Sequence, residues 1–269
     1  MDNRPIGVFD SGLGGLTMIK ALKELIPNQD LIYLGDTGRV PYGSRSNTTI
    51  AKYASQNAAF LATFNIKVMV VACNTVCSVA FDAVENYTMP VYEVVKTPAK
   101  AAVKNTKNNK IGVIGTTATV KSGAYERAIK ELNPNIEVYS VPSPMLVPLV
   151  EEGWTKPDDE IAYKIVERYL SEFNNKDIDT LILGCTHYPL LSEVIKKVAG
   201  KDITLIDSGA KTAEFVASDL KARNLLPEKE SKGTIAYYVT DSVESFITKA
   251  SGFLDADIND KVQKIELEL

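Results

Sequence analysis

Two short segments of the chain share a pattern that can do chemistry, because each is an apolar run that ends in a cysteine. They cover residues 70–75 and 182–187, and the cysteines are Cys73 and Cys185. An apolar run bounded in this way is typical of a buried parallel strand, so each cysteine should lie where a strand gives way to a helix. The dipole and the free N–H groups of a helix N-terminus lower the pKa of a thiol from about 8.5 toward neutrality. We therefore expect two activated thiols.

Such a pair of thiols is suited to acid/base catalysis. A thiolate can remove a proton, and a thiol can supply one, if the pKa lies near the working pH. One cysteine on each face of a carbon atom would invert a stereocentre without a metal or an organic cofactor. His187 is the only histidine of the chain, and it could hold Cys185 as a thiolate or deliver its proton. We predict that Cys73 and Cys185 are the catalytic acid/base pair and that no cofactor is needed.

A zinc site is the alternative interpretation of the same residues. Cys73, Cys77, Cys185 and His187 are all zinc-binding residue types. Structural zinc sites use closely spaced pairs in loops, however, and Cys73 and Cys77 are expected one turn apart on a helix. We predict no metal site, and we expect Cys77 to be packed inside.

Residues 10–15 form a glycine-rich turn after an expected strand, which is suited to holding an anion at a helix N-terminus. A carboxylate would fit as well as a phosphate. The turn lacks the Gly-Lys-Ser/Thr ending of a P-loop, and Thr17 occupies the third glycine position of the dinucleotide fingerprint. Asp10 could bind a substrate ammonium, orient a thiol or cap the turn.

Other polar positions that follow expected strands or precede helices could line the same site: Tyr42, Gly43, Thr116, Thr117, Thr119, Glu151 and Glu152. The tyrosine would offer a phenol and the glycine an open N–H group at the cleft. The threonine turn could bind a carboxylate, and one of the two glutamates could relay a proton. The ordinary alternatives are a surface turn, a helix cap and a solvated acid.

Strand and helix patterns alternate along the chain, which predicts an α/β fold with parallel sheets. We expect strands near residues 6–9, 31–34, 70–73, 91–94, 111–116, 182–185, 205–208 and 234–240. We expect helices near residues 16–26, 48–64, 75–87, 98 onward, 210–220 and 242–254, a proline-rich connection at 142–148, and an edge strand or a loose end at the C-terminus.

The pattern of the first half recurs in the second half. Residues 111–116 resemble residues 6–11, and Cys185 stands in the context of Cys73. Any two α/β units look alike at this level, but the matched cysteines favour two related half-chains. Because ligands of open α/β sheets bind beyond the C-terminal ends of the strands, both cysteines should face one cleft.

The composition limits the possible partners of the chain. Its 269 residues carry a net charge of −4, so no basic surplus is available for nucleic acid as the main partner. No apolar run reaches membrane-spanning length, and the N-terminus enters a strand without a secretory signal. Three cysteines are typical of reduced thiols in a cytoplasmic protein.

Four motifs in order resemble the glutamate racemases, which belong to the cofactor-independent aspartate/glutamate racemase family. They are residues 9–15, Asp36 with residues 41–43, residues 72–75 and residues 184–189. The likeness runs from about Ile6 to Leu220. It implies that the chain interconverts L- and D-glutamate with two cysteines and supplies D-glutamate for peptidoglycan. Glutamate is then the expected partner, and a homodimer the expected assembly. A racemase for aspartate, and a binding protein without catalysis, stay open as alternatives.

The resemblance also implies roles for individual residues. Cys73 and Cys185 correspond to the two acid/base residues, and Asp10, Glu151 and His187 to auxiliary proton-transfer residues. The Glu151 match rests on the looser motif 148–151, and the adjacent glutamate keeps it open. The substrate-contacting positions are Asp10, Ser11, Tyr42, Gly43, Asn74, Thr75, Thr186 and His187, to which the threonine turn adds Thr116 and Thr119.

The expected architecture follows from these two lines of reasoning. We predict two pseudo-symmetric α/β domains, each with a parallel sheet, and an active site in the cleft between them. The resemblance implies that the C-terminal segment returns to the first domain. The expected domains are therefore residues 1–97 with residues 210–269, and residues 98–209.

Overall fold

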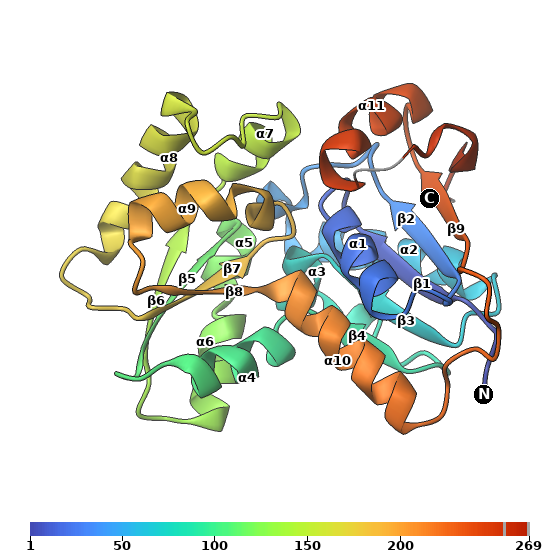
Figure 1. Ribbon diagram of the computed structural model, residues 1–269, viewed down its shortest axis with the longest axis horizontal. Helices are drawn as coiled ribbons and strands as arrows, with labels where there is room; N and C mark the ends of the chain where they lie inside the picture. The colour runs from blue at the N-terminus through green and yellow to red at the C-terminus, as the bar shows by residue number, and fades with distance from the viewer. Residues whose placement is uncertain (255–256, 268–269) are drawn as a thin grey trace.

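In the computed structural model, which describes residues 1–254 and 257–267, strands and helices alternate around two parallel sheets (Figure 1). The first sheet has the order β10-β9-β2-β1-β3-β4 and the second the order β6-β5-β7-β8. The first sheet contains β1 (Ile6–Asp10), β2 (Leu31–Gly35), β3 (Val68–Val71), β4 (Val91–Glu93), β9 (Ile235–Val239) and β10 (Val262–Lys264). The second contains β5 (Lys110–Gly115), β6 (Glu137–Pro142), β7 (Thr180–Gly184) and β8 (Thr204–Asp207).

Helices separate and cover these strands. The longer ones are α1 (Leu16–Leu25), α2 (Asn47–Ala62), α4 (Lys96–Asn105), α6 (Ala124–Leu132), α8 (Glu160–Leu170), α9 (Ser192–Ala199), α10 (Ser208–Ala222) and α11 (Val243–Leu254). The shorter ones are α3 (Asn74–Val79), α5 (Thr117–Ser122) and α7 (Leu146–Glu151). Single 3₁₀ turns are η1 (Tyr42–Ser44), η2 (Phe81–Ala83), η3 (Ser171–Phe173), η4 (Tyr188–Leu191) and η5 (Asn259–Lys261).

The two sheets share one strand order, since β2-β1-β3-β4 corresponds to β6-β5-β7-β8. In each half the chain begins in a central strand, places the next strand on one side and the third on the other. All pairings between the described strands are parallel. The predicted α/β fold with two pseudo-symmetric sheets is therefore confirmed.

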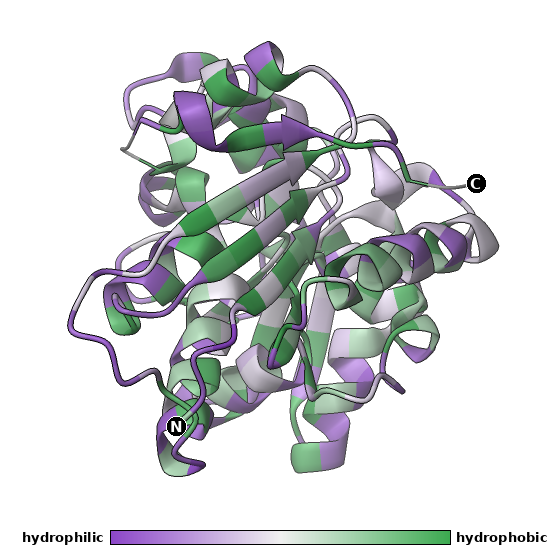
Figure 2. Ribbon diagram, turned by 90° about the vertical axis from the view of Figure 1, so that its right-hand side faces the viewer, coloured by the Kyte–Doolittle hydropathy of each residue, from purple (hydrophilic) through white to green (hydrophobic). Residues whose placement is uncertain are grey.

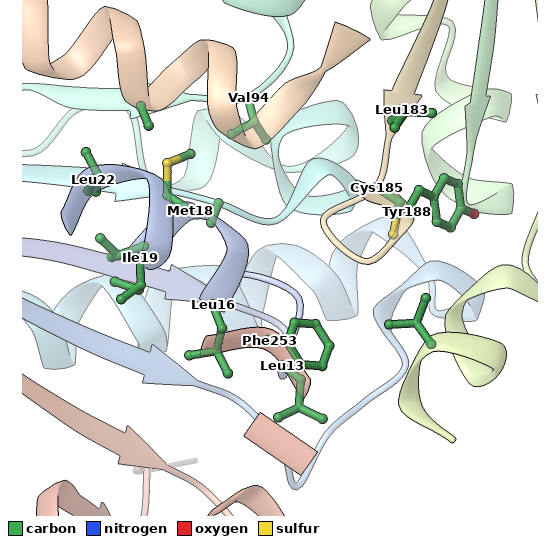
Figure 3. Close-up of a cluster of buried hydrophobic side chains, with 14 of the residues drawn as sticks. Leu13, Leu16, Met18, Ile19, Leu22, Val94, Leu183, Cys185, Tyr188 and Phe253 are labelled. Atoms are coloured by element: carbon green, nitrogen blue, oxygen red, sulfur yellow. The ribbon is translucent and has the colours of Figure 1, made fainter. Parts of the chain in front are cut away.

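The central strands are continuous apolar runs because helices cover both faces of their sheets. Every residue of β1, β2, β3 and β7 is buried. Figure 2 shows these strands of the first sheet largely in green, with hydrophilic residues at the loops and on the outer helix faces. The hydrophobic core continues from one half to the other, because Leu16 of α1 and Leu183 of β7 belong to one cluster of buried side chains (Figure 3).

The register of the strands places the cysteines. In the first sheet Phe9 pairs with Val71, so β1 and β3 end side by side. In the second, Gly115 pairs with Gly184, so β5 and β7 also end together. In both halves the second strand lies on one side of the first and the third strand on the other, so the strand order reverses between these two strands. In α/β sheets a crevice opens beyond the C-terminal strand ends at such a reversal.

The C-terminal segment joins the first sheet. Helix α10 packs against both α1 and α4, and the chain then enters β9, which pairs with β2 along its whole length. The final described strand, β10, pairs with β9 as an edge strand. Of the two expectations for the C-terminus, the edge strand is the one that the structure has, and residues 268–269 lie outside the described residues.

Two local expectations were wrong. The helix expected from the first cysteine to residue 87 ends at Val79, because the chain turns at Ala80 into a 3₁₀ turn. The connection expected at residues 142–148 is partly regular: Pro142 ends β6, and Pro148 is the third residue of α7. A proline is accepted in the first turn of a helix because its missing N–H group would have no partner there.

Candidate active site

The C-terminal ends of β1, β3, β5 and β7 face one small cavity between the two sheets. Its volume is about 40 Å³. The lining residues are Ser11, Val40, Pro41, Tyr42, Gly43, Cys73, Asn74, Thr75, Thr116, Val147, Glu151, Cys185, Thr186 and His187.

Cys73 lies at the N-cap of α3, as expected, but it is buried, with only 4% of its surface exposed. Burial raises the pKa of its thiol to about 12, and the nearby carboxyl of Asp10 adds to this effect. Hydrogen bonds from the N–H of Val76 and the hydroxyl of Ser11 act in the opposite direction and are outweighed. The expected lowering of this pKa was wrong, because burial destabilises the thiolate by more than the N-terminus of the six-residue helix α3 stabilises it.

Cys185 belongs to a line of interacting side chains. Its Sγ lies 3.9 Å from Nδ1 of His187, whose Nε2 lies 3.2 Å from Oε1 of Glu151. Burial lowers the pKa of the imidazole, but the contacts with Cys185 and Glu151 outweigh it and raise the pKa to about 10. The hydrogen bond with His187 in turn lowers the pKa of Glu151. Of the two candidate glutamates, Glu151 therefore meets the histidine, whereas Glu152 is exposed.

Asp10 is fully buried behind the cavity wall and is not among the lining residues. Its Oδ2 accepts a hydrogen bond of 3.0 Å from the N–H of Gly12, and its Oδ1 lies 3.5 Å from the hydroxyl of Thr186. Burial raises the pKa of this carboxyl, although His187 and backbone N–H groups lower it. Its contacts are those of a residue that caps the turn and holds Thr186.

The glycine turn presses against the loop after β7. A Cβ atom on Gly14 would lie 2.1 Å from Oγ1 of Thr186 and 2.6 Å from Nδ1 of His187. Only a residue without a side chain allows this approach. The turn after the first strand of one sheet therefore sets the position of catalytic candidates carried by the other sheet.

The phenol of Tyr42 does not face the cavity as a free hydroxyl, which corrects the expectation. It donates a hydrogen bond to the buried carboxylate of Asp36 and accepts one of 3.1 Å from Asn57. Arg39 binds the same carboxylate at 2.7 and 2.9 Å. This network fixes the loop that carries Gly43, where a Cβ atom would lie 2.8 Å from Cβ of Thr116.

The polar residues after β3 and β5 contact one another. The hydroxyls of Thr75 and Thr116 are 3.0 Å apart, and Thr116 also caps α5 by accepting the N–H of Thr119 at 3.2 Å. Thr119 is buried behind Thr116 and does not line the cavity, unlike the expectation. Asn74 turns its amide toward Tyr125, at 2.8 Å, and so joins the two halves beneath the site.

Sequence reasoning missed several contacts. Val40 and Val147 line the cavity, and both stand beside motifs that were recognised. Two residues of α11 also reach the site. Nζ of Lys249 lies 3.8 Å from Oε2 of Glu151. The ring of Phe253 packs edge-on against that of His187, with 6.0 Å between the ring centroids. No motif marks α11, so its sequence carried no signal for this role.

The zinc alternative gains no support from the geometry. Within residues 1–254 and 257–267, no group of three or more His, Cys, Asp or Glu side chains is placed to hold a metal ion. The thiol of Cys77 donates a hydrogen bond to the carbonyl of Val71 at 3.3 Å, and burial raises its pKa.

Within residues 1–254 and 257–267, no helix has the length and apolar character that crossing a membrane requires.

A sequence model of the Asp/Glu/hydantoin racemase family matches residues 6–216. The chain belongs to this family. The glutamate racemase of Geobacter metallireducens is 42% identical over 266 residues, which cover 98% of this chain and 97% of that relative. Among solved structures, the glutamate racemase of Francisella tularensis in complex with D-glutamate is 40% identical, with a TM-score of 0.92 over 100% of this chain and 99% of the other. A glutamate racemase isoform of Bacillus anthracis has a TM-score of 0.94 and is 38% identical, and the match covers 99% of both chains.

Membership of this racemase family explains why the halves match. A racemase acts on both enantiomers of its substrate. Two half-sites at equivalent strand ends suit this task, because each could place a proton-transfer group on one side of the substrate carbon.

Proposed function

We propose that the chain is a glutamate racemase in which Cys73 and Cys185 are the two acid/base residues. The observation that carries the proposal is their placement: the cysteines follow the equivalent strands β3 and β7, and both line one cavity. Similarity over the full length to glutamate racemases supports glutamate as the substrate.

The reaction consists of two proton transfers. The thiolate of one cysteine takes the α-proton of glutamate and becomes a thiol, while the electron pair stays on the α-carbon. The thiol of the other cysteine donates its proton to the opposite face and becomes a thiolate. The raised pKa of Cys73 favours the thiol at neutral pH. The raised pKa of His187 favours its protonated form, which places a positive charge 3.9 Å from the sulfur of Cys185.

The auxiliary roles follow from the contacts. His187 and Glu151 assist Cys185, and Asp10 acts through Thr186. Hydroxyl and N–H groups around the cavity supply the hydrogen bonds for the substrate's charged groups. We propose the substrate-binding set Asp10, Ser11, Tyr42, Gly43, Asn74, Thr75, Thr116, Thr119, Thr186 and His187, in which Asp10 acts by holding Thr186, Thr119 supports Thr116 and Tyr42 forms the wall.

The wider proposals concern organisation and cellular role. We propose residues 1–97 with 210–269 as one domain and residues 98–209 as the other, which the membership of the two sheets supports. We also propose that the enzyme acts in the cytoplasm, supplies D-glutamate for peptidoglycan and forms a homodimer.

Circular dichroism of L-glutamate during incubation with the purified protein tests the proposed function. The signal should decay to zero without added cofactor and in excess chelator, and D-glutamate should approach the same end point. L-aspartate, one carbon shorter, should react far more slowly. A stable glutamate signal, or faster decay with aspartate, would refute the assignment.

A further inference from the structure

A line of four side chains leads from the active site to the C-terminal helix. It runs from Sγ of Cys185 to Nδ1 of His187 at 3.9 Å, and from Nε2 of His187 to Oε1 of Glu151 at 3.2 Å. The other carboxylate oxygen of Glu151, Oε2, lies 3.8 Å from Nζ of Lys249. Glu151 therefore receives the imidazole on one oxygen and the ammonium on the other.

Lys249 is carried by a firmly anchored helix. Three residues before Lys249, Phe246 is buried, and its ring stacks on that of Tyr33 with 6.3 Å between the ring centroids. Four residues after Lys249, Phe253 packs against the ring of His187. Figure 1 shows α11 above the first sheet and α7 above the second, both along the upper side of the view. The Lys249–Glu151 pair thus spans the two halves.

The stability that this ion pair supplies is small. The side chains of Lys249 and Glu151 are 36% and 24% exposed, and pairs of this kind contribute little to folding. The consequence for geometry is larger. The hydrogen bond with His187 contributes most to the lowered pKa of Glu151, and the charge of Lys249 acts in the same direction. Because the ammonium lies at Oε2, it holds the carboxylate turned so that Oε1 faces Nε2 of His187. The partner of one imidazole nitrogen fixes the orientation of the ring, and with it the approach of Nδ1 to the sulfur.

The half-site of Cys73 has a different environment. The hydrogen bonds to its sulfur come from the hydroxyl of Ser11 and the N–H of Val76. Among the described residues, no hydrogen bond or ion pair joins Ser11 or Val76 to α11, and the nearby carboxyl of Asp10 acts on Cys73 through its charge alone. An effect of Lys249 should therefore fall on one thiol and spare the other.

We propose that Lys249 is a positioning residue for Cys185, which it serves through Glu151 and His187, and that it governs the rate of proton transfer at Cys185 and not at Cys73. This inference rests on the proposed racemase function. It assigns to the returning C-terminal helix a part in the chemistry of the opposite half-site.

The test uses glutamate carrying deuterium at the α-carbon, in both enantiomeric forms. The equilibrium constant between enantiomers is one, so kcat/KM must be equal in the two directions and cannot reveal which thiol is affected. The primary isotope effect can, because the two proton transfers run in series and slowing one makes it more rate-limiting. We expect Lys249→Met to lower kcat/KM about two- to fivefold. The isotope effect should rise for the enantiomer that Cys185 deprotonates and fall for the other.

Two further variants complete the experiment. Lys249→Arg keeps the charge and should restore both isotope effects. Lys211→Met is the matched control, since Lys211 is also 36% exposed and also pairs with a glutamate, Glu214, but on α10 away from the site. It should leave both isotope effects unchanged.

The outcomes separate this inference from the proposed function. An isotope effect is a ratio of rates within one preparation, so partial loss of folded protein does not change it. If Lys249→Met leaves both isotope effects unchanged, or moves them together, the positioning role is refuted while the racemase assignment stands. If the unmodified protein does not racemise glutamate, the proposed function itself fails.

Discussion

Cys73 and Cys185 occupy equivalent places in the two halves, yet their surroundings differ. Burial of Cys73, together with the nearby carboxyl of Asp10, raises the pKa of its thiol to about 12. Cys185 lies 3.9 Å from an imidazole whose own pKa is raised to about 10. The fold supplies the symmetry that both enantiomers require, and the neighbouring side chains make the two thiols chemically distinct.

Replacing either cysteine should stop the reaction in both directions. In the proposed mechanism each direction needs one thiol as base and the other as acid, and loss of one such group costs about 10²- to 10⁴-fold. We expect Cys73→Ala and Cys185→Ala to retain the fold, measured by far-UV circular dichroism, and to lose racemisation of L- and D-glutamate alike. Cys77→Ala is the control and should affect stability more than rate. Near-normal activity of a folded Cys185→Ala protein would contradict the assignment.

The raised pKa of His187 predicts a pH dependence of stability. The folded protein binds this proton more tightly than the unfolded chain, whose histidine titrates near 6.5. The contribution to the free energy of unfolding is therefore complete below pH 6.5 and is lost as pH rises toward 10. Urea denaturation of the natural protein and of His187→Asn between pH 6 and pH 10 should show their difference shrinking as pH rises. A constant difference would show that the histidine has an ordinary pKa.

The elements around the site meet in ways that strand and helix patterns only partly foretell. Alternation predicted β1, β3, β5 and β7, and the resemblance of the two apolar runs predicted that both cysteines follow strands. The patterns could not show that α3 stops at Val79, since that depends on the local turn at Ala80. Nor could they show that Tyr42 turns its hydroxyl to Asp36, because that requires the loop and α2 to be folded against each other.

The contact of the glycine turn with the loop after β7 leads to a prediction at the scale of elements. Gly14→Ala would place a Cβ atom 2.1 Å from Thr186 and 2.6 Å from His187, so the two elements must move apart. Because a displacement of about 1 Å can cost about 100-fold in rate, we expect a loss of that order in kcat/KM. Gly252→Ala, on α11 with nothing within 4 Å of the new Cβ atom, is the matched control and should keep full activity. Equal activities would show that the loops tolerate separation.

The whole molecule brings together residues that lie far apart in the chain. The four motifs predicted most of the cavity wall, because each motif follows a strand end and strand ends of parallel sheets meet at one edge. The contribution of α11 could not be predicted, since Lys249 and Phe253 reach the site only after β9 has joined the first sheet. Such contacts are a property of the tertiary fold and leave no local pattern in the sequence.

Contributing one thiol from each half has a consequence for the origin of the product's proton. In the proposed mechanism the thiol that abstracts the α-proton is not the one that protonates the product, and the donating thiol can exchange with solvent between turnovers. In D₂O, product formed at a few per cent conversion should therefore carry deuterium at the α-carbon, while recovered substrate stays largely protiated. Mass spectrometry from both L- and D-glutamate measures this. A single base moving between the two faces would return the original proton, so substantial protium in the early product would remove the need for Cys73 and Cys185 to act in opposite roles.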